Sequence, residues 1–277
     1  MNLATPLFIA PQLPALWDAL GLIMLIALVG WLWSFWRSNV NLVDSLWSLL
    51  FLGAACIYAW PSLPDPRTQL ILLLISAWAL RLSLHLLRRN WGHAEDRRYA
   101  AMRERNSPFA WRSVYIVFGL QGVLAWIIAM PLFYAVQPST ALTGDFSLLE
   151  MIGLSLWGIG FLFESIADAQ LHRFRQVPEN HGRVLDRGLW HYSRHPNYFG
   201  EACIVWGLYL LAIPTGGAWT VSAPILMTLL LLKVSGVSLL ESDISERRPA
   251  YQDYIQRTSA FIPWPPRKHQ PPAAEQL

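Results

Sequence analysis

Residues 20–37 are LGLIMLIALVGWLWSFWR, an apolar run that ends at Arg37. A helix needs about 20 apolar residues to cross the roughly 30 Å hydrocarbon layer of a bilayer. Together with the residues just before it, this run predicts a membrane span over 14–36. No Lys or Arg precedes it and no clear cleavage site of small residues follows it, so we expect a retained helix rather than a signal peptide.

Further apolar runs of the same kind continue along the chain. Hydrophobic residues make up 54% of the sequence and charged residues only 14%, whereas soluble domains carry about 25% charged residues. The sequence therefore predicts an all-α integral membrane bundle of seven transmembrane helices, folded as a single domain over 1–277. Pro131 is expected to kink the fourth span. The remaining predicted spans are 41–60, 67–88, 112–136, 147–168, 197–213 and 218–240.

The basic residues set the expected orientation. They gather in alternate connections, at Arg37 and in the segments 88–112, 173–194 and 247–268, with Arg67 as the exception. Cytoplasmic loops carry an excess of Lys and Arg. With seven spans, this bias predicts an external N-terminus and a cytoplasmic C-terminus. The short loops and compact length favour a bacterial inner membrane.

Four acids fall inside the predicted spans, namely Asp44, Glu164, Asp168 and Glu201. An ionisable residue at membrane depth is costly and is by default a functional candidate. Such acids can instead pair with an Arg or a Trp N–H to hold helices together. We favour function for Glu164 and Asp168, and the two interpretations of Asp44 stay open.

Glu164, Asp168, His172 and Arg175 recur at spacings of four, four and three residues. On a helix this places all four along one face that runs from the membrane toward the cytoplasmic connection. Such a face suits a ligand with hydroxyl or amide groups at one end and phosphates at the other. The alternative is a series of ion pairs on the helix surface.

The run GLWHYSRHPNYFGE, residues 188–201, precedes and enters the sixth span. Pro196 suits the first turn of a helix, which places Asn197 and Glu201 one turn apart. The free N–H groups of a helix N-terminus attract phosphate. Arg183, Arg187 and Arg194 could add charge-assisted bonds to a diphosphate, although Arg-His-Pro at a membrane boundary could also be topology-setting charge.

Other segments are less specific. Residues 91–99 mix acids, bases and an aromatic ring, and could hold a ribose or order the loop through ion pairs. Residues 247–254, followed by the aromatic residues of 261–266, predict a short amphipathic helix that lies back on the bundle. Its aromatic rings could cover a bound ligand, or they could anchor the helix at the membrane surface. Gly158 and Gly160 are expected to serve helix packing. The scattered histidines predict no metal site, and a formal charge of +3 is too small to predict nucleic-acid binding.

The 188–201 run resembles the C-terminal domain of the membrane steroid 5-alpha-reductase family, including its bacterial branch. The likeness extends from about the second span to Trp264, and the final YQDYIQRTSAFIPWP, residues 251–265, is typical of the bacterial members. The resemblance implies that NADPH is held in the cytoplasmic half of the bundle and donates a hydride to the beta carbon of a conjugated 3-keto-4-ene steroid or a related isoprenoid enone. The apolar substrate would enter from the lipid bilayer.

The resemblance also implies roles for individual residues. Asp44 and Trp78 stand near positions at which a Glu and a Tyr polarise the ketone in mammalian members, so they become the candidate catalytic residues; Val43 stands where that pattern has Gln. The cofactor contacts carried over by position are Glu164, Asp168, Arg175, Arg183, Tyr192, Arg194, His195, Asn197 and Glu201, with Asp96 and Arg98 as additions.

Two other functions stay open. A looser R-H-P-x-Y-x-G pattern occurs in isoprenylcysteine carboxyl methyltransferases, so a membrane methyltransferase that uses S-adenosylmethionine is the first alternative. A lipid-binding or scaffold protein without enzymatic activity is the second. The sequence leaves the oligomeric state open.

Overall fold

The computed structural model describes residues 13–138, 146–234, 237, 241 and 250–267. Over these residues the chain is helical, with no β-strand. Seven helical segments are long and apolar enough to cross a membrane, so the chain is an integral membrane protein, as its composition predicts. These spans are Leu13–Arg37, Leu42–Ser62, Pro66–Asn90, Phe109–Ala135, Leu148–Gln176, Pro196–Thr215 and Gly217–Val234.

The chain divides into two compact units. The N-terminal unit comprises Met1–Asp145 with Leu211–Ala223, and the C-terminal unit comprises Phe146–Leu210 with Pro224–Leu277. Each unit holds one part of the predicted site, so each is described by itself.

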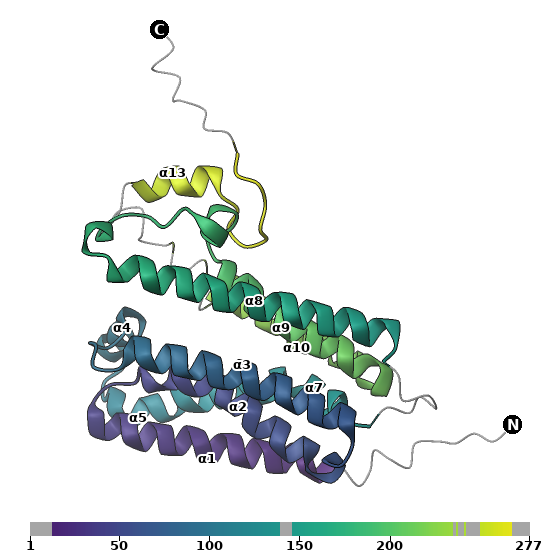
Figure 1. The fold of residues 1–277 in the computed structure, drawn as a ribbon. Helices are drawn as coiled ribbons and strands as arrows, with labels where there is room; N and C mark the ends of the chain where they lie inside the picture. Colours follow the sequence, from purple (N-terminus) through teal and green to yellow (C-terminus); the bar gives the residue numbers. More distant parts are fainter. Residues whose placement is uncertain (1–12, 139–145, 235–236, 238–240, 242–249, 268–277) are drawn as a thin grey trace, which may run out of the picture. The chain divides into compact units, whose positions relative to one another are not determined.

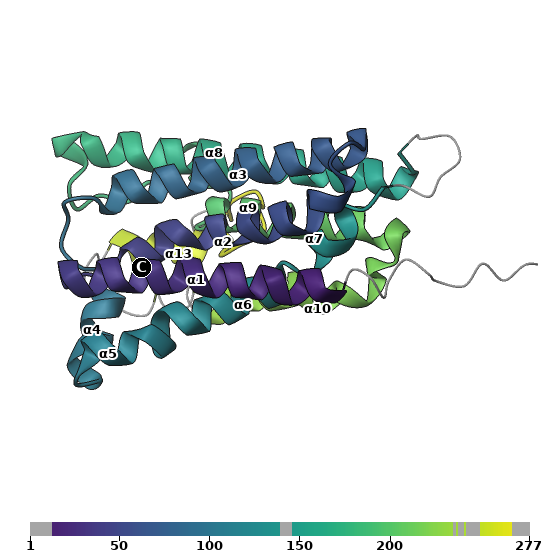
Figure 2. The same cartoon turned by 90° about the horizontal axis from the view of Figure 1, so that it is seen from below.

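The N-terminal unit is built on three long helices, α1 (Leu13–Arg37), α2 (Leu42–Ala59) and α3 (Pro66–Asn90). α2 packs against both α1 and α3, and α6 (Leu120–Ile128) runs beside α1 (Figures 1 and 2). The remaining helices of this unit are α4 (Arg97–Arg105), α5 (Phe109–Ser113) and α7 (Met130–Ala135).

The fourth span is interrupted twice. A π-helical stretch, Val114–Gly119, separates α5 from α6, and α6 ends at Ile128 before α7 begins at Met130. Pro131 lies in the first turn of α7, where its missing N–H leaves no intrahelical bond unmade. The break that the sequence predicts at Pro131 is therefore present.

The C-terminal unit is centred on α8 (Leu148–Gln176) and α9 (Pro196–Ala212), with α10 (Ser222–Leu229) and α13 (Ala250–Arg257). Ser147 and Glu150 form a capping box that fixes the start of α8. A Cβ on Gly160 would lie 2.5 Å from the carbonyl oxygen of Gly200, so the two backbones touch there. Gly160 thus serves packing, as expected, whereas a Cβ on Gly158 would meet no atom within 4 Å.

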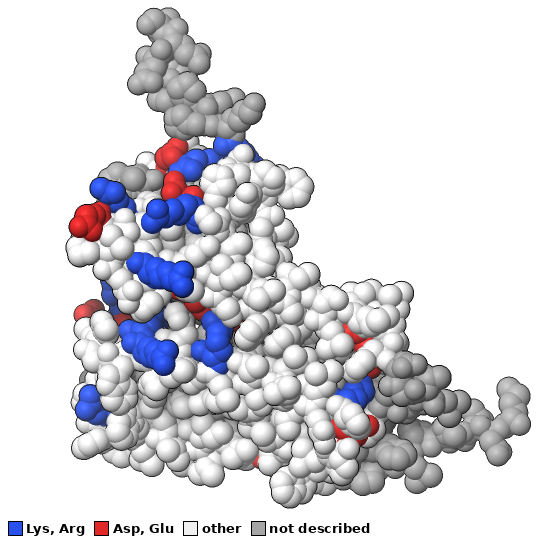
Figure 3. Space-filling view, viewed as in Figure 1, with Lys and Arg blue, Asp and Glu red and all other residues white. Residues whose placement is uncertain are grey.

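The helix flanks are apolar and exposed. Leu25 and Leu28 of α1, Leu73 of α3 and Leu162 of α8 are each more than 40% exposed. Figure 3 shows that charged side chains are nearly absent from the helix flanks in view and gather where helices end. Such faces suit contact with lipid chains, because every backbone polar group is satisfied inside its own helix.

Candidate functional site

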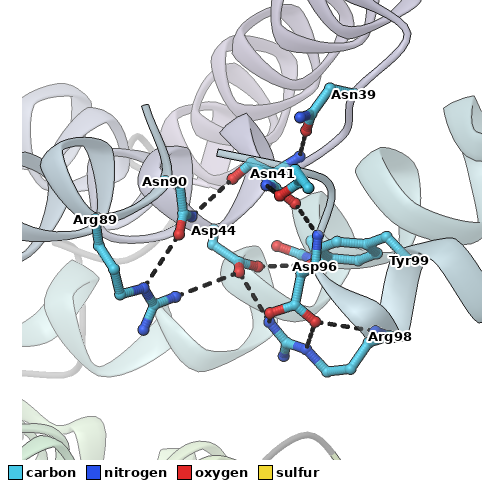
Figure 4. Close-up of polar contacts among 10 residues, drawn as sticks. Asn39, Asn41, Asp44, Arg89, Asn90, Asp96, Arg98 and Tyr99 are labelled. Carbon is cyan, nitrogen blue, oxygen red and sulfur yellow. Dashed lines mark hydrogen bonds and ion pairs between the residues drawn. The ribbon is translucent and has the colours of Figure 1, made fainter. Parts of the chain in front are cut away.

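The polar end of α2 in the N-terminal unit carries a hydrogen-bonded cluster around Asp44. Asp44 lies in the first turn of α2, at the end of the span rather than at its middle. Its Oδ1 accepts a hydrogen bond from the Tyr99 hydroxyl at 2.5 Å, and its Oδ2 accepts one from Arg98 Nη2 at 2.9 Å (Figure 4). The Arg89 guanidinium lies 3.9 Å from the same Oδ2. Asp44 is therefore an ion-paired acceptor.

The loop before α4 positions Arg98 and Tyr99. Asp96 caps α4 by accepting from the Arg98 backbone N–H at 2.9 Å, and the same oxygen accepts from Arg98 Nε at 2.9 Å. Asn41, just before α2, accepts from the Asp96 N–H at 2.7 Å and donates to the Ala94 carbonyl at 3.0 Å. These bonds tie the start of α4 to the start of α2, so the Arg98 guanidinium lies between Asp96 and Asp44 and binds both.

The environment keeps the proton on Tyr99 and removes it from Asp96. Burial, followed by the negative charge of Asp44, raises the pKa of Tyr99 well above its ordinary value of 10.0. Burial alone would raise the pKa of Asp96, but hydrogen bonds and attraction from Arg98 outweigh it and lower the pKa below 3.8. The cluster therefore holds a neutral phenol at neutral pH, and Asp96 stays ionised to lower pH than an ordinary aspartate.

Trp78 is not part of this cluster. It is fully buried in α3 and packs edge-on against Phe51 of α2, with ring centroids 5.6 Å apart. Arg89, which reaches Asp44, lies three turns further along α3, a rise of about 16 Å. The aromatic hydroxyl beside Asp44 belongs to Tyr99 instead.

In the C-terminal unit, Arg194 and His195 are bound to a carboxylate outside the predicted set. Arg194 forms a two-pronged ion pair with Glu241, through Nε at 2.7 Å and Nη2 at 2.9 Å. His195 Nε2 lies 2.9 Å from Glu241 Oε1. Burial alone would raise the pKa of Glu241, but hydrogen bonds from His195 and Arg194 lower it below 4.5. The exposed fractions of Arg194 and His195 are only 7% and 5%.

Arg194 and its neighbours also hold the C-terminal segment, mostly through backbone atoms. Arg194 Nη1 donates to the carbonyls of Ile255 at 2.9 Å and Thr258 at 2.6 Å. The Ser193 hydroxyl donates to the Phe261 carbonyl at 2.8 Å, and the Trp264 N–H donates to a carbonyl of the 188–201 run at 3.0 Å. Four donors of the Arg194 guanidinium are therefore engaged within the chain.

The helix pair α8 and α9 brings the predicted acids together with Asn197. The Asn197 amide donates to Asp168 Oδ1 at 3.2 Å. Glu164 and Asp168 are buried on α8, as is Glu201 on α9, and Gly200 contacts the backbone at Glu164. Four of the predicted cofactor residues thus lie on two helices that touch.

The other predicted cofactor residues are exposed. Arg175 ends α8, Arg183 lies in the connection that follows, and the Tyr192 side chain is 46% exposed. A cavity of about 380 Å³ lies in the same unit, but none of these three residues is among those that line it. Its lining includes Arg173, Arg187, Phe174 and Gln170.

Sequence reasoning missed Tyr99 and Glu241. Tyr99 lies in a segment singled out for its acids and bases, and its position three residues after the cap Asp96 turns it toward α2. Glu241 is 46 residues from His195 and follows the seventh span, so no spacing pattern links the two. A buried arginine that needs a carboxylate is the one signal that points to such a partner.

Comparison with known proteins places the chain in a family. It is 25% identical to an uncharacterized protein of Schizosaccharomyces pombe over 276 residues, which cover 88% of this chain and 78% of the relative. No solved structure matches the chain. A family model described as "Protein of unknown function (DUF1295)" matches residues 30–258, which include both clusters. The chain therefore belongs to the DUF1295 family.

Proposed function

We propose that this protein uses NADPH to reduce the C=C bond of a conjugated ketone. The substrate is a steroid-like or isoprenoid enone that enters the protein from the membrane. The observation that carries the proposal is the cavity of about 380 Å³ in the C-terminal unit. Guanidinium groups of Arg173 and Arg187 and the ring of Phe174 line it. Ligand pockets usually measure about 300–1,000 Å³, so the cavity suits the adenosine phosphate end of a dinucleotide.

The donors in this unit fit such a cofactor, with one revision. Phosphates need guanidinium groups that are not already bound to a carboxylate. Among the described residues, neither Arg173 nor Arg187 forms an ion pair, whereas Arg194 and His195 are bound to Glu241. We therefore assign phosphate binding to Arg173 and Arg187 and a positioning role to Arg194.

The same unit offers groups for the uncharged parts of the cofactor. The Phe174 ring, whose centre lies 5.9 Å from the guanidinium carbon of Arg187, offers a flat surface for the base beside that arginine. Asp168 can accept from hydroxyl or amide groups, and the Asn197 amide orients its carboxylate. NADPH supplies the hydride when bound, and the chain binds, orients and excludes water.

The N-terminal unit supplies a proton-bearing donor. A carbonyl that gains negative charge is stabilised by a donor in a site from which water is excluded. Tyr99 is 5% exposed and keeps its proton because its pKa is raised, first by burial and then by Asp44. We assign carbonyl polarisation to Tyr99, which would turn its one phenolic proton from Asp44 Oδ1 to the substrate, and to Asp44 the role of holding the phenol in place until then.

Purified protein, NADPH and a panel of 3-keto-4-ene steroids test the reaction through loss of reduced-nicotinamide absorbance. Replacing Arg173 and Arg187 by Gln should raise the KM for NADPH at least tenfold with little change in kcat, because each charge-assisted bond contributes about 1.5–3 kcal/mol. Arg105→Gln, an exposed arginine of α4, is the charge-matched control.

Tyr99→Phe tests the donor. It should lower kcat about a hundredfold while NADPH binding is unchanged, as expected for the loss of one oxyanion donor. Binding of S-adenosylmethionine without binding of NADPH would overturn the proposal in favour of a methyltransferase.

A further inference from the structure

A second cavity, in the N-terminal unit, lies at the ends of α1 and α3 and the start of α2. Its volume is about 200 Å³. The polar residues that line it are Arg37, Asn39, Asn41, Ser45, Asn90 and His93, and Trp33 and Trp91 also contribute. No Asp or Glu lines it, which makes it a cavity for an anion or a neutral group.

Three amides form a fixed wall of this cavity. Asn39 accepts from the Asn41 N–H at 2.9 Å, and Asn90 donates to the Asn41 carbonyl at 3.3 Å. The Asn41 side chain is engaged with the 94–96 loop, so it does not cap α2. The first turn of α2, an 18-residue helix, therefore faces the cavity at Leu42 without a side-chain cap.

Ser45 provides a second, independent sign of a ligand. The residue is 2% exposed and lines the cavity, yet among the described residues its hydroxyl has no hydrogen-bond partner. A buried hydroxyl without a partner is unfavourable by about 1–3 kcal/mol. Its oxygen is buried in the structure, so a turn of the side chain toward the cavity would bring it to a ligand oxygen and satisfy it.

Arg37 supplies the charge. It ends α1, is exposed and lines the cavity, and within the described ranges it takes part in no ion pair or hydrogen bond. The nearby carboxylates do not compete for it: Asp44 is bound to Arg98, and Glu95 to Arg103 at 2.7 Å.

We propose that this cavity binds the phosphate of a headgroup with net negative charge, through Arg37, the Ser45 hydroxyl and the uncapped start of α2. A zwitterionic headgroup would bring its cation close to Arg37, and no Asp or Glu lines the cavity to pair with that cation. Helix N-termini and arginines are both common phosphate ligands. Trp33 and Trp91 mark the level at which aromatic rings meet lipid headgroups. The cavity is smaller than the roughly 300–1,000 Å³ that drug-sized ligands occupy, so it suits a headgroup rather than a whole dinucleotide. The residues that line this cavity are different from those that line the cavity proposed for NADPH.

Native mass spectrometry of the full chain, released from nanodiscs that contain phosphatidylcholine and phosphatidylglycerol, tests this proposal without NADPH. The wild type should retain phosphatidylglycerol in preference to phosphatidylcholine. Arg37→Gln should lower this retention about tenfold, in line with the loss of a charge-assisted bond, and the control Arg105→Gln should leave it unchanged. Competition with soluble glycerol phosphate identifies the source: displacement means that the phosphate suffices, and no displacement means that the acyl chains are needed.

Ser45→Ala separates binding from folding. It should weaken phosphatidylglycerol retention about threefold. In pure phosphatidylcholine its unfolding temperature should match or exceed that of the wild type, because the variant removes a buried hydroxyl that had no partner. Equal retention by wild type and Arg37→Gln, or an equal loss in Arg105→Gln, would overturn the proposal. A fall in unfolding temperature for Ser45→Ala in phosphatidylcholine would also overturn it, since the hydroxyl would then have a purely structural role.

Discussion

Asp44 is held by donors from two elements, Arg89 at the end of α3 and Arg98 with Tyr99 in α4. Its side chain is 14% exposed, so these bonds are poorly screened by solvent. The sequence identified Asp44 as a polar residue in a span and left its role open between structure and function. The contacts support both roles, since the carboxylate joins α2 to α4 and holds the Tyr99 phenol.

Asp44→Asn should therefore destabilise the fold by about 2 kcal/mol, because a charge-assisted bond to Arg98 is lost. Thermal unfolding in detergent measures the change as a fall of several degrees. Glu104→Gln, an exposed acid of α4, is the control and should unfold like the wild type. An unchanged unfolding temperature for Asp44→Asn would show that Asp44 does not join α2 to α4.

Stability should fall in acid because of Glu95. Burial alone would raise the pKa of Glu95, but its bonds to Arg103 and to the Val40 N–H lower it below 4.5. A lowered pKa stabilises the folded state above the unfolded value, and this contribution disappears as pH falls through the folded value. We expect it to be complete at pH 7 and to decline below about 4.5.

Unfolding temperatures of wild type and Glu95→Gln across this pH range measure the effect. The variant should be less stable at pH 7 and should converge with the wild type as pH falls through the lowered pKa of Glu95. A constant difference between the two at every pH would contradict the assignment.

At the scale of elements, most helix boundaries follow from local signals. Pro61 and Pro66 flank the turn after α2, Asp65 caps α3, and Pro196 begins α9. The C-terminal amphipathic helix is present as α13, and its predicted residues 247–249 lie outside the described residues. Such signals act within a few residues, so they can be read from sequence.

Arg67 shows where local signals fail. It was the exception to the charge bias, because it lies on the expected external side. The structure buries it, at 7% exposure, with its guanidinium donating to the carbonyls of Ala135, Gln137 and Leu211. These carbonyls lie at or near the C-terminal ends of α7 and α9, where a positive charge is favourable. Arg67 thus stabilises helix ends, and its partners are too distant in sequence to be predicted.

Glycine packing between α8 and α9 gives a matched pair of variants. Gly160→Ala would place a Cβ 2.5 Å from the Gly200 carbonyl oxygen, so the helices must separate, and we expect a loss of about 1–3 kcal/mol. Gly158→Ala, two residues away in open space, should be neutral or stabilise by up to about 1 kcal/mol through helix propensity. Thermal unfolding in detergent compares the two, and similar values would mean that the helix contact contributes little.

At the scale of the whole molecule, hydropathy predicted the seven spans because each must satisfy its own backbone in lipid. The ends differ from the predicted ones by a few residues, except that α8 continues eight residues past 168, to Gln176, and that the predicted end of the seventh span at residue 240 lies outside the described residues. The last two turns of α8 carry polar residues, so a prediction based on hydropathy ended the helix too early. The orientation stays a prediction of the charge bias.

Labelling with a membrane-impermeant maleimide tests this orientation in a variant without Cys56 and Cys203. Single cysteines at Glu104 and Glu179 should react only after the membrane is opened, because both lie in basic connections. A cysteine at Ser62 should react in intact cells. The reverse pattern would invert the topology, and reaction at Glu104 and Ser62 from the same side would contradict the span count between them.

The segment after α13 is held by its main chain, since Ser193, Arg194 and Tyr192 meet carbonyls or an N–H of residues 255–264. These hydrogen bonds to backbone atoms do not depend on the side chains of the segment. Positions such as Ser259 and Ala260 can therefore change while the path of the chain is preserved, whereas the ring of Phe261 also packs edge-on against Phe199 of α9, with ring centroids 5.9 Å apart. Proline at position 264 is a change that this freedom excludes, because it would erase the N–H that Tyr192 receives.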